Sequence, residues 1–325
     1  MKKISLKLLF SFIIILITII SCGNKKEEKI RIAAIKGPPA MGVVKLFSDN
    51  EEGKTLNKYD SKIVSTSDEI IALIGKEELD IATVPSNLAS VLYNKTEGKI
   101  QVASIIAFGV LYIVENEGNN LNTLKDLKGK TIYANGKGAT PEIVLKYILK
   151  GNGLELGKDV KIEFKSEATE VINALSNDKK GVALLNQPFL TVAQSKNPKL
   201  RIAFSIEEEW DKIIKTNKGS QVSGVIIVNK NFAEKNPKKV ENFLKEYEQS
   251  VKFIKENSDE GAKLISKYGI IPEPIAKKAI LGTNITYVDG NEMKEKISEY
   301  LKILFEEDPK IIGGKIPKDD FYYIK

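Results

Sequence analysis

Short apolar runs of strand length alternate along the chain with longer segments whose apolar positions recur at helical spacing. Two such series occur, separated by a loop-like stretch at residues 116–122. This alternation is typical of an α/β fold with mainly parallel sheets and helices on both sheet faces. The predicted strands are residues 30–35, 62–65, 79–84, 101–108, 110–114, 131–134, 160–164, 181–185, 200–204 and 223–228, and long helices are expected at residues 234–257, 258–268 and 291–305.

Two series of strands and helices predict two lobes. The chain is expected to cross from the first lobe to the second near residues 110–116 and to return near residues 221–225, so that two strands form a hinge. On this interpretation lobe 1 comprises residues 30–113 and 224–325, and lobe 2 comprises residues 114–223.

The first 22 residues differ from the rest of the chain. Lys2, Lys3 and Lys7 accompany an apolar run at residues 8–20, and the only cysteine, Cys22, follows it. The run is shorter than the roughly 20 apolar residues that a membrane span needs, and it suits the apolar region of an export signal. The alternative is a buried N-terminal helix with an incidental cysteine.

Cys22 and the residues around it resemble the lipobox of bacterial lipoproteins, in which the cysteine takes a diacylglycerol and becomes the mature N-terminus. The resemblance implies a signal peptide at residues 1–21, lipidation at Cys22 and a short polar tether at residues 22–29. We therefore expect the mature protein on the extracytoplasmic face of the cell membrane, held there by its lipid.

Composition narrows the possible chemistry. Without the three signal lysines, the 50 Lys and Arg become 47 against 43 Asp and Glu, and no basic run is interleaved with aromatic residues, so a nucleic-acid partner is not expected. The chain has no histidine, which excludes histidine-activated nucleophiles and histidine–metal sites. Carboxylates and lysines remain available for catalysis. The absences favour a binding protein over an enzyme, and no catalytic residue, cofactor or metal ligand is assigned.

The two arginines of the chain, Arg31 and Arg201, stand near the starts of predicted strands. Ligands of open α/β sheets lie beyond the carboxyl ends of the strands instead. A pocket built on an arginine–carboxylate pair is therefore not expected.

Four loops share one pattern, in which an apolar strand leads through a short polar or proline-containing turn into a helix. Each places the N–H groups of a helix start at the carboxyl end of a strand, where they bind acidic or hydrogen-bond-accepting groups. Two of these loops fall in each predicted lobe, so a ligand could be held from both sides of a cleft. The predicted liners are Pro39, Ala40, Met41, Ser86, Asn87, Gly138, Thr140, Asn186 and Gln187, with Phe108 and Ser223 near the hinge.

Each loop also has an ordinary structural interpretation. Ser86 is typical of a helix cap, and Thr140 followed by Pro141 is a typical helix start. Asn186 and Gln187 carry the strongest signal, because two adjacent amides after a buried strand are unusual for simple capping. The backbone N–H groups of Ala40 and Thr140 are the expected donors to a ligand.

The order of several segments resembles a known family. Residues 35–42, 79–85 and 184–188, with a C-terminal stretch at residues 309–317, are similar to bacterial ABC-transporter substrate-binding proteins. The most similar group binds alkanesulfonates, taurine, nitrate and pyrimidine precursors of thiamine. The resemblance covers nearly the whole mature chain. It implies a type II periplasmic-binding-protein fold, whose two lobes close around a ligand.

This resemblance implies a solute-binding protein, expected to be a monomer, that captures a small polar or anionic organic solute and delivers it to an ABC permease and its ATPase. Asn186 and Gln187 stand where relatives often carry an acidic residue, so the solute stays open. One alternative is a secreted enzyme on the same fold, using a carboxylate such as Glu142 or a lysine such as Lys36. Another is a surface sensor without transport partners.

Overall fold

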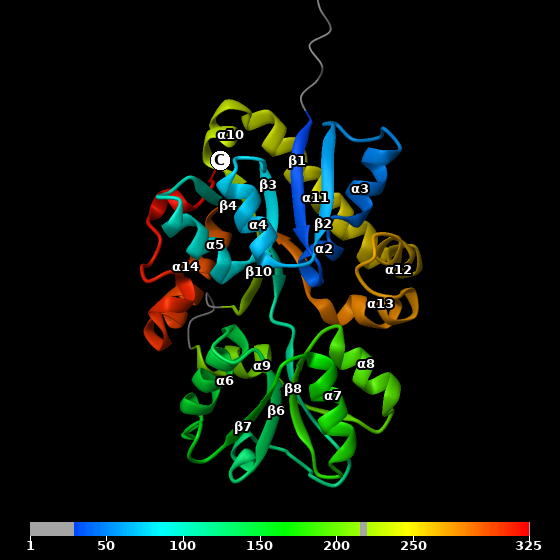
Figure 1. The fold of residues 1–325 in the computed structure, drawn as a ribbon, viewed down its shortest axis with the longest axis vertical. Helices are drawn as coiled ribbons and strands as arrows, with labels where there is room; N and C mark the ends of the chain where they lie inside the picture. The colour runs from blue at the N-terminus through cyan, green and yellow to red at the C-terminus, as the bar shows by residue number, and fades with distance from the viewer. Residues whose placement is uncertain (1–28, 215–219, 325) are drawn as a thin grey trace, which may run out of the picture.

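The computed structural model describes residues 29–214 and 220–324. The chain forms two α/β lobes, each built on one sheet, with the six-stranded sheet in the upper lobe of Figure 1 and the five-stranded sheet in the lower lobe. The predicted signal peptide, Cys22 and residues 22–28 of the predicted tether lie outside the described residues. None of the described helices is long and apolar enough to cross a membrane.

The six-stranded sheet has the strand order β11-β4-β10-β3-β1-β2. Within it, β1 pairs in parallel with β2 and β3, whereas β10 runs antiparallel to β3 and β4, and β11 runs antiparallel to β4. The short strand β11 was not predicted from the sequence. The strands are β1 (Ile30–Ile35), β2 (Tyr59–Val64), β3 (Ile81–Pro85), β4 (Ile100–Phe108), β10 (Val222–Asn229) and β11 (Ile285–Val288).

The five-stranded sheet has the order β7-β6-β8-β5-β9. Here β6 pairs in parallel with β7 and β8, while β5 runs antiparallel to β8 and β9. Its strands are β5 (Leu111–Glu115), β6 (Thr131–Asn135), β7 (Lys161–Lys165), β8 (Val182–Asn186) and β9 (Arg201–Ser205).

The α/β fold class is confirmed, but both sheets are mixed rather than mainly parallel. Every antiparallel pair involves β5, β10 or β11. The chain passes from the first sheet to the second between β4 and β5 and returns before β10. β5 and β10 are the first strands after the two crossings, so each runs away from the gap between the sheets. The strands that pair with them run in the opposite direction, toward the gap. As a result, the carboxyl ends of β1, β2, β3, β6 and β8 all face the gap between the sheets.

The helices cover both faces of each sheet (Figure 1). The predicted helix at residues 234–257 is divided into two, because Pro237 has no N–H to continue the hydrogen-bond ladder of the preceding helix. Helices of the first lobe are α2 (Pro38–Met41), α3 (Val44–Glu51), α4 (Ser67–Gly75), α5 (Ser86–Lys95), α10 (Lys230–Lys235), α11 (Pro237–Glu256), α12 (Ser258–Lys267), α13 (Glu273–Ala279) and α14 (Gly290–Glu307). Those of the second are α6 (Thr140–Gly151), α7 (Ala168–Asn177), α8 (Phe189–Lys196) and α9 (Ile206–Ile213), and short 3₁₀ turns include η2 (Ile280–Thr283) and η3 (Pro309–Ile312).

Successive residues of a strand face opposite sides of its sheet, so the six-stranded sheet contributes to two apolar cores. In β1, Ala33 packs with the residues of α5 and α14, and its neighbour Ala34 packs with those of α11 on the opposite face. The core of the α5 and α14 face continues into the second lobe. There Trp210 of α9 is fully buried between Tyr147 of α6 and Tyr300 of α14. The two lobes therefore share an apolar contact beside the gap.

Candidate functional site

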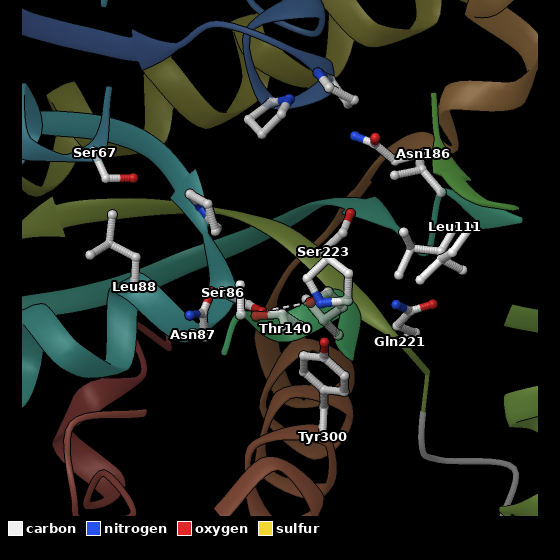
Figure 2. A pocket seen from close by; sticks show the side chains of 18 of the residues that line it. Ser67, Ser86, Asn87, Leu88, Leu111, Thr140, Asn186, Gln221, Ser223 and Tyr300 are labelled. Carbon is white, nitrogen blue, oxygen red and sulfur yellow. Dashed lines mark hydrogen bonds between the residues drawn. The ribbon is translucent and has the colours of Figure 1, made fainter. Parts of the chain in front are cut away.

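A cavity of about 440 Å³ lies between the two sheets, where the carboxyl ends of their strands meet. The starts of α2, α4, α5 and α6 reach it, and α14 closes one side (Figure 2). Both lobes and both crossings contribute to its wall. The lining residues are Pro38, Pro39, Ser67, Pro85, Ser86, Asn87, Leu88, Val110, Leu111, Asn135, Ala139, Thr140, Pro141, Leu184, Asn186, Gln221, Val222, Ser223 and Tyr300.

Hydroxyl groups of the lining fix the crossing strands. The Ser86 hydroxyl donates to the carbonyl oxygen of Val222 at 2.5 Å, and the Ser223 hydroxyl donates to that of Phe108 at 2.6 Å. Asn87 Nδ2 donates to the Ile311 carbonyl oxygen at 3.3 Å. These bonds use the single donor of each serine hydroxyl and one of the two N–H donors of Asn87, and the oxygen lone pairs of the three side chains remain for a ligand.

Three amides of the lining have polar atoms that the protein does not use. Within residues 29–214 and 220–324, neither Asn135 nor Asn186 makes a side-chain hydrogen bond, and Gln221 Oε1 has no partner although Gln221 is only 2% exposed. Burying a polar group without a hydrogen bond costs free energy. The Asn135 and Asn186 amides are therefore open to hydrogen bonds from the cavity, whereas Gln221 Oε1 lies against Gly109.

The cavity is electrically neutral. Among its described lining residues none is Asp, Glu, Lys or Arg. Burial raises the pKa of the Tyr300 phenol, so its hydroxyl stays protonated at neutral pH. The described residues also hold no cluster of three or more His, Cys, Asp or Glu side chains that could bind a metal ion. The lining offers hydrogen-bonding groups and apolar side chains.

Both arginines bind carboxylates of the protein itself. The Arg31 guanidinium pairs with Asp80, with Nη2 and Oδ1 2.6 Å apart, and Arg201 pairs with the buried Glu115. Arg31 lies in β1 and Arg201 at the start of β9. The expectation that no arginine–carboxylate pair forms the pocket agrees with this arrangement.

The structure brings six of the eleven residues predicted as liners to the cavity, and they come from both lobes and the hinge. Thr140 is the first residue of α6 rather than its cap, because Ala139 takes the capping position. The Thr140 hydroxyl therefore does not cap the helix and is available to the cavity. The six residues are Pro39, Ser86, Asn87, Thr140, Asn186 and Ser223.

The other five predicted residues lie outside the lining. Ala40 and Met41 are fully buried in the core beneath it, and the Ala40 N–H, expected to serve a ligand, instead donates to the Gly37 carbonyl oxygen at 3.0 Å. Gln187 is 5% exposed, and its Oε1 accepts a bond from the Thr191 hydroxyl at 2.8 Å.

Gly138 and Phe108 also contact other residues of the protein. The Gly138 N–H donates to the Glu142 carboxylate at 2.6 Å, and the Lys296 ammonium lies 5.8 Å from the centre of the Phe108 ring. The groups of all five residues serve internal contacts, which sequence spacing does not reveal.

Sequence reasoning missed four polar liners: Ser67, Asn135, Gln221 and Tyr300. Asn135 ends β6 as Asn186 ends β8, so the pattern of an amide at the carboxyl end of a strand could have found it. Ser67 follows a predicted strand at the start of an amphipathic helix, which is the same loop pattern. Tyr300 lies in the middle of α14, and no local signal separates it from a core tyrosine.

Side chains beside the cavity join the two lobes. Asn284 Nδ2, from the segment between η2 and β11, donates to the Gly109 carbonyl oxygen at 2.7 Å and to Glu207 Oε2 of α9 at 2.8 Å. Burial, with the nearby Asp211 carboxylate, raises the pKa of Glu207 to about 7. Glu207 is thus a titratable group at the junction of the lobes.

A second junction lies at the end of α14. The Glu307 carboxylate accepts from Lys146 at 3.0 Å and from Lys150 at 2.9 Å, and both lysines belong to α6 of the other lobe. These contacts, with the Trp210–Tyr300 ring contact, hold the lobes together around the cavity.

Two α/β lobes, joined by two crossings and enclosing a cavity at their facing strand ends, define the class of periplasmic substrate-binding proteins. The sequence comparison gives the family within this class. The chain belongs to the ABC transporter, phosphonate, periplasmic substrate-binding protein family, whose model matches residues 54–272. Comparison with curated proteins gives no significant match.

Solved structures show the same fold. An ABC transporter protein from Parabacteroides distasonis is 24% identical, with a TM-score of 0.76 over 91% of this chain and 99% of that one. The aliphatic sulphonate binding protein SsuA from Escherichia coli is 14% identical, with a TM-score of 0.69 over 90% of this chain and 92% of that one. An alkanesulfonate-binding protein from Xanthomonas axonopodis, bound to MOPS, gives 0.61 at 14% identity, covering 89% and 94%.

Proposed function

We propose that this chain is the lipid-anchored, extracytoplasmic solute-binding component of an ABC importer, and that it captures a small organic solute between its lobes. The observation that carries the proposal is the cavity of about 440 Å³, whose wall is made by strand ends and helix starts of both sheets. Small-molecule sites typically occupy about 300–1,000 Å³. Membership in a periplasmic substrate-binding family supports the same assignment.

The cavity suggests how binding would be coupled to delivery. A solute that first meets Ser86 and Asn87 on one lobe reaches Asn186 on the other only when the lobes are together. Such a solute has a higher affinity for the closed arrangement and shifts the population toward it. The permease would then recognise the closed form, in which Glu307 pairs with Lys146 and Lys150.

We propose binding rather than turnover. The two groups suggested for an enzyme, Lys36 and Glu142, are not among the cavity lining, and the Glu142 carboxylate accepts a bond from the Gly138 N–H. The chain also has no histidine to transfer a proton. Mass spectrometry of a bound solute after prolonged incubation should recover the solute unchanged, and a product would favour the enzyme.

The anchor and the lobe boundaries complete the proposal. We take residues 1–21 as the signal peptide and Cys22 as the lipidated residue, and we place the lobes at residues 30–113 with 224–325 and at residues 114–223. A Cys22→Ser variant should leave the membrane fraction and appear in the soluble fraction. An unchanged distribution would exclude the lipid anchor.

The binding function is tested by a thermal-shift screen of the purified protein with sulfonates, phosphonates, pyrimidines and small amides. A solute that raises Tm should be captured with one molecule per chain in calorimetry. If no compound raises Tm, the proposed function fails. Co-purification of an ABC permease with the tethered protein separates the importer from the surface sensor, which needs no such partner.

A further inference from the structure

The polar part of the cavity consists of amides and hydroxyls. Asn135 and Asn186 end strands that point into it, and Gln221 stands at the second crossing. Each amide offers N–H donors and a carbonyl acceptor. Gln221 Oε1 is buried without a partner among the described residues, but it lies against Gly109, so the amides open to a solute are those of Asn135 and Asn186. A solute with both donors and acceptors satisfies these groups, whereas an oxyanion, which only accepts, leaves the carbonyl oxygens unmatched.

The helix starts facing the cavity are already partly neutralised by the chain's own carboxylates. At α6, Glu142 accepts the N–H of Gly138 at 2.6 Å. At α4, Glu69 Oε1 accepts the N–H groups of Ser65 at 2.9 Å and of Thr66 at 3.1 Å. A carboxylate at these positions interacts favourably with the positive end of the helix dipole and offsets its attraction for a second anion.

Prolines remove further donors from the same rim. Four of the lining residues are prolines, and a proline has no backbone N–H. They stand within α2, immediately before α5 and within the first turn of α6. Three of the four helix starts around the cavity, those of α2, α4 and α6, therefore carry a proline or an acidic residue in the first turn, whereas α5 keeps its first N–H groups. These prolines are Pro38, Pro39, Pro85 and Pro141.

Resting on the proposed function, we infer that the solute has no net charge: it is a carboxamide, lactam or N-heterocycle with donor and acceptor groups on an apolar body. The amides bind its polar edge, while Leu88, Leu111 and Leu184 contact its apolar part. A charge without a partner in such a cavity costs several kcal/mol. The site therefore selects against phosphonate and sulfonate anions, after which the matched family and the SsuA proteins are named.

Calorimetry on the full-length mature protein tests this with a panel of matched pairs. Each small amide, lactam or N-heterocycle is measured beside a carboxylate, sulfonate or phosphonate on the same ring, for example nicotinamide beside nicotinate and pyridine-3-sulfonate. We expect at least one neutral compound to bind, with its anionic counterpart weaker by about 100-fold or more.

The outcomes separate this inference from the proposed function. If an anion binds more tightly than its neutral counterpart, or if only anions bind, the inference is overturned and the solute-binding function stands. If no member of the panel binds, both are overturned. Neutral binding with rejection of the matched anions supports both.

Variants locate the selectivity within the cavity. Asn186→Asp places a carboxylate where the neutral amide stands, and we expect the neutral probe to bind about 10-fold less tightly. The control is Asn291→Asp on the exposed surface of α14, which should bind as the wild type does. Equal affinities in the two variants would overturn the inference.

Lys215 and Lys218 belong to the segment outside the described residues, so K215Q/K218Q is measured as well. The ratio of neutral to anion affinity should be that of the wild type. A ratio that changes by 10-fold or more would show that lysines set the selectivity and would contradict the inference.

Discussion

The buried carboxyl of Glu207 makes a specific prediction about pH. Glu207 lies on α9 at the lobe junction, where Oε2 accepts from Asn284, and burial is the main cause that raises its pKa from the ordinary 4.5 to about 7. Because the folded-state pKa is above the unfolded one, the folded protein binds the extra proton between these values. The contribution of Glu207 to the unfolding free energy is then fully present below pH 4.5 and is lost as the pH rises through about 7.

The size of the effect follows from the same shift. One pKa unit corresponds to about 1.4 kcal/mol, so the upper limit is about 3 kcal/mol. Glu207 retains some exposure, and screening by water reduces this value. We expect the wild type to lose about 1–3 kcal/mol of unfolding free energy between pH 4.5 and pH 8 relative to Glu207→Gln, which cannot ionise.

Urea denaturation of both proteins at pH 5, 6, 7 and 8, followed by far-UV circular dichroism, measures this difference. The pKa of Asp211 is also raised by burial, and the variant keeps that group, so only the difference between the two pH profiles reports on Glu207. Glu234→Gln, at an exposed position of α10, is the control and should follow the wild type. If the wild type and Glu207→Gln differ by the same amount at every pH, the argument from burial is wrong.

Three further changes probe the lobes and the cavity. Trp210→Ala removes a fully buried ring between the lobes and should cost about 3–5 kcal/mol in urea denaturation; a cost below 1 kcal/mol would contradict this packing. Asn186→Ala should weaken binding of a solute found in the screen about 2–10-fold in calorimetry, because one hydrogen bond is lost. Asn291→Ala is the control, and equal affinities of the two variants would exclude Asn186 from the site. Glu307→Gln loses both ion pairs to α6. Its solute affinity should be about 2–5-fold lower than that of the control variant Glu306→Gln. Equal affinities would show that these ion pairs do not stabilise the closed form.

The alternation of strands and helices, and the two-lobed α/β class, were accessible from sequence because the strands are short apolar runs bounded by turn residues. Strand direction was not accessible. Each lobe receives a crossing strand that runs against its neighbours, and nothing in the composition of β5 or β10 marks this. The strand β11 was also not predicted, since its few residues pair only with β4, which lies far away in the sequence.

The candidate site divides in a similar way. Ser86, Thr140 and Asn186 follow directly from the strand–turn–helix pattern, and the structure brings them to one cavity. Ala40 and Gln187 follow the same pattern, yet their polar groups serve internal hydrogen bonds. Such local pairing depends on one-residue shifts in helix starts, which sequence patterns do not resolve.

Native mass spectrometry of freshly purified protein tests the central claim most directly. We predict one small molecule per chain, released on unfolding. The molecule should be lost from Asn186→Trp, in which the indole takes up part of the cavity, and retained by Asn291→Trp, which changes the exposed surface of α14. A wild-type protein that carries no molecule, or an Asn186→Trp variant that retains it as well as Asn291→Trp does, would contradict solute capture between the lobes.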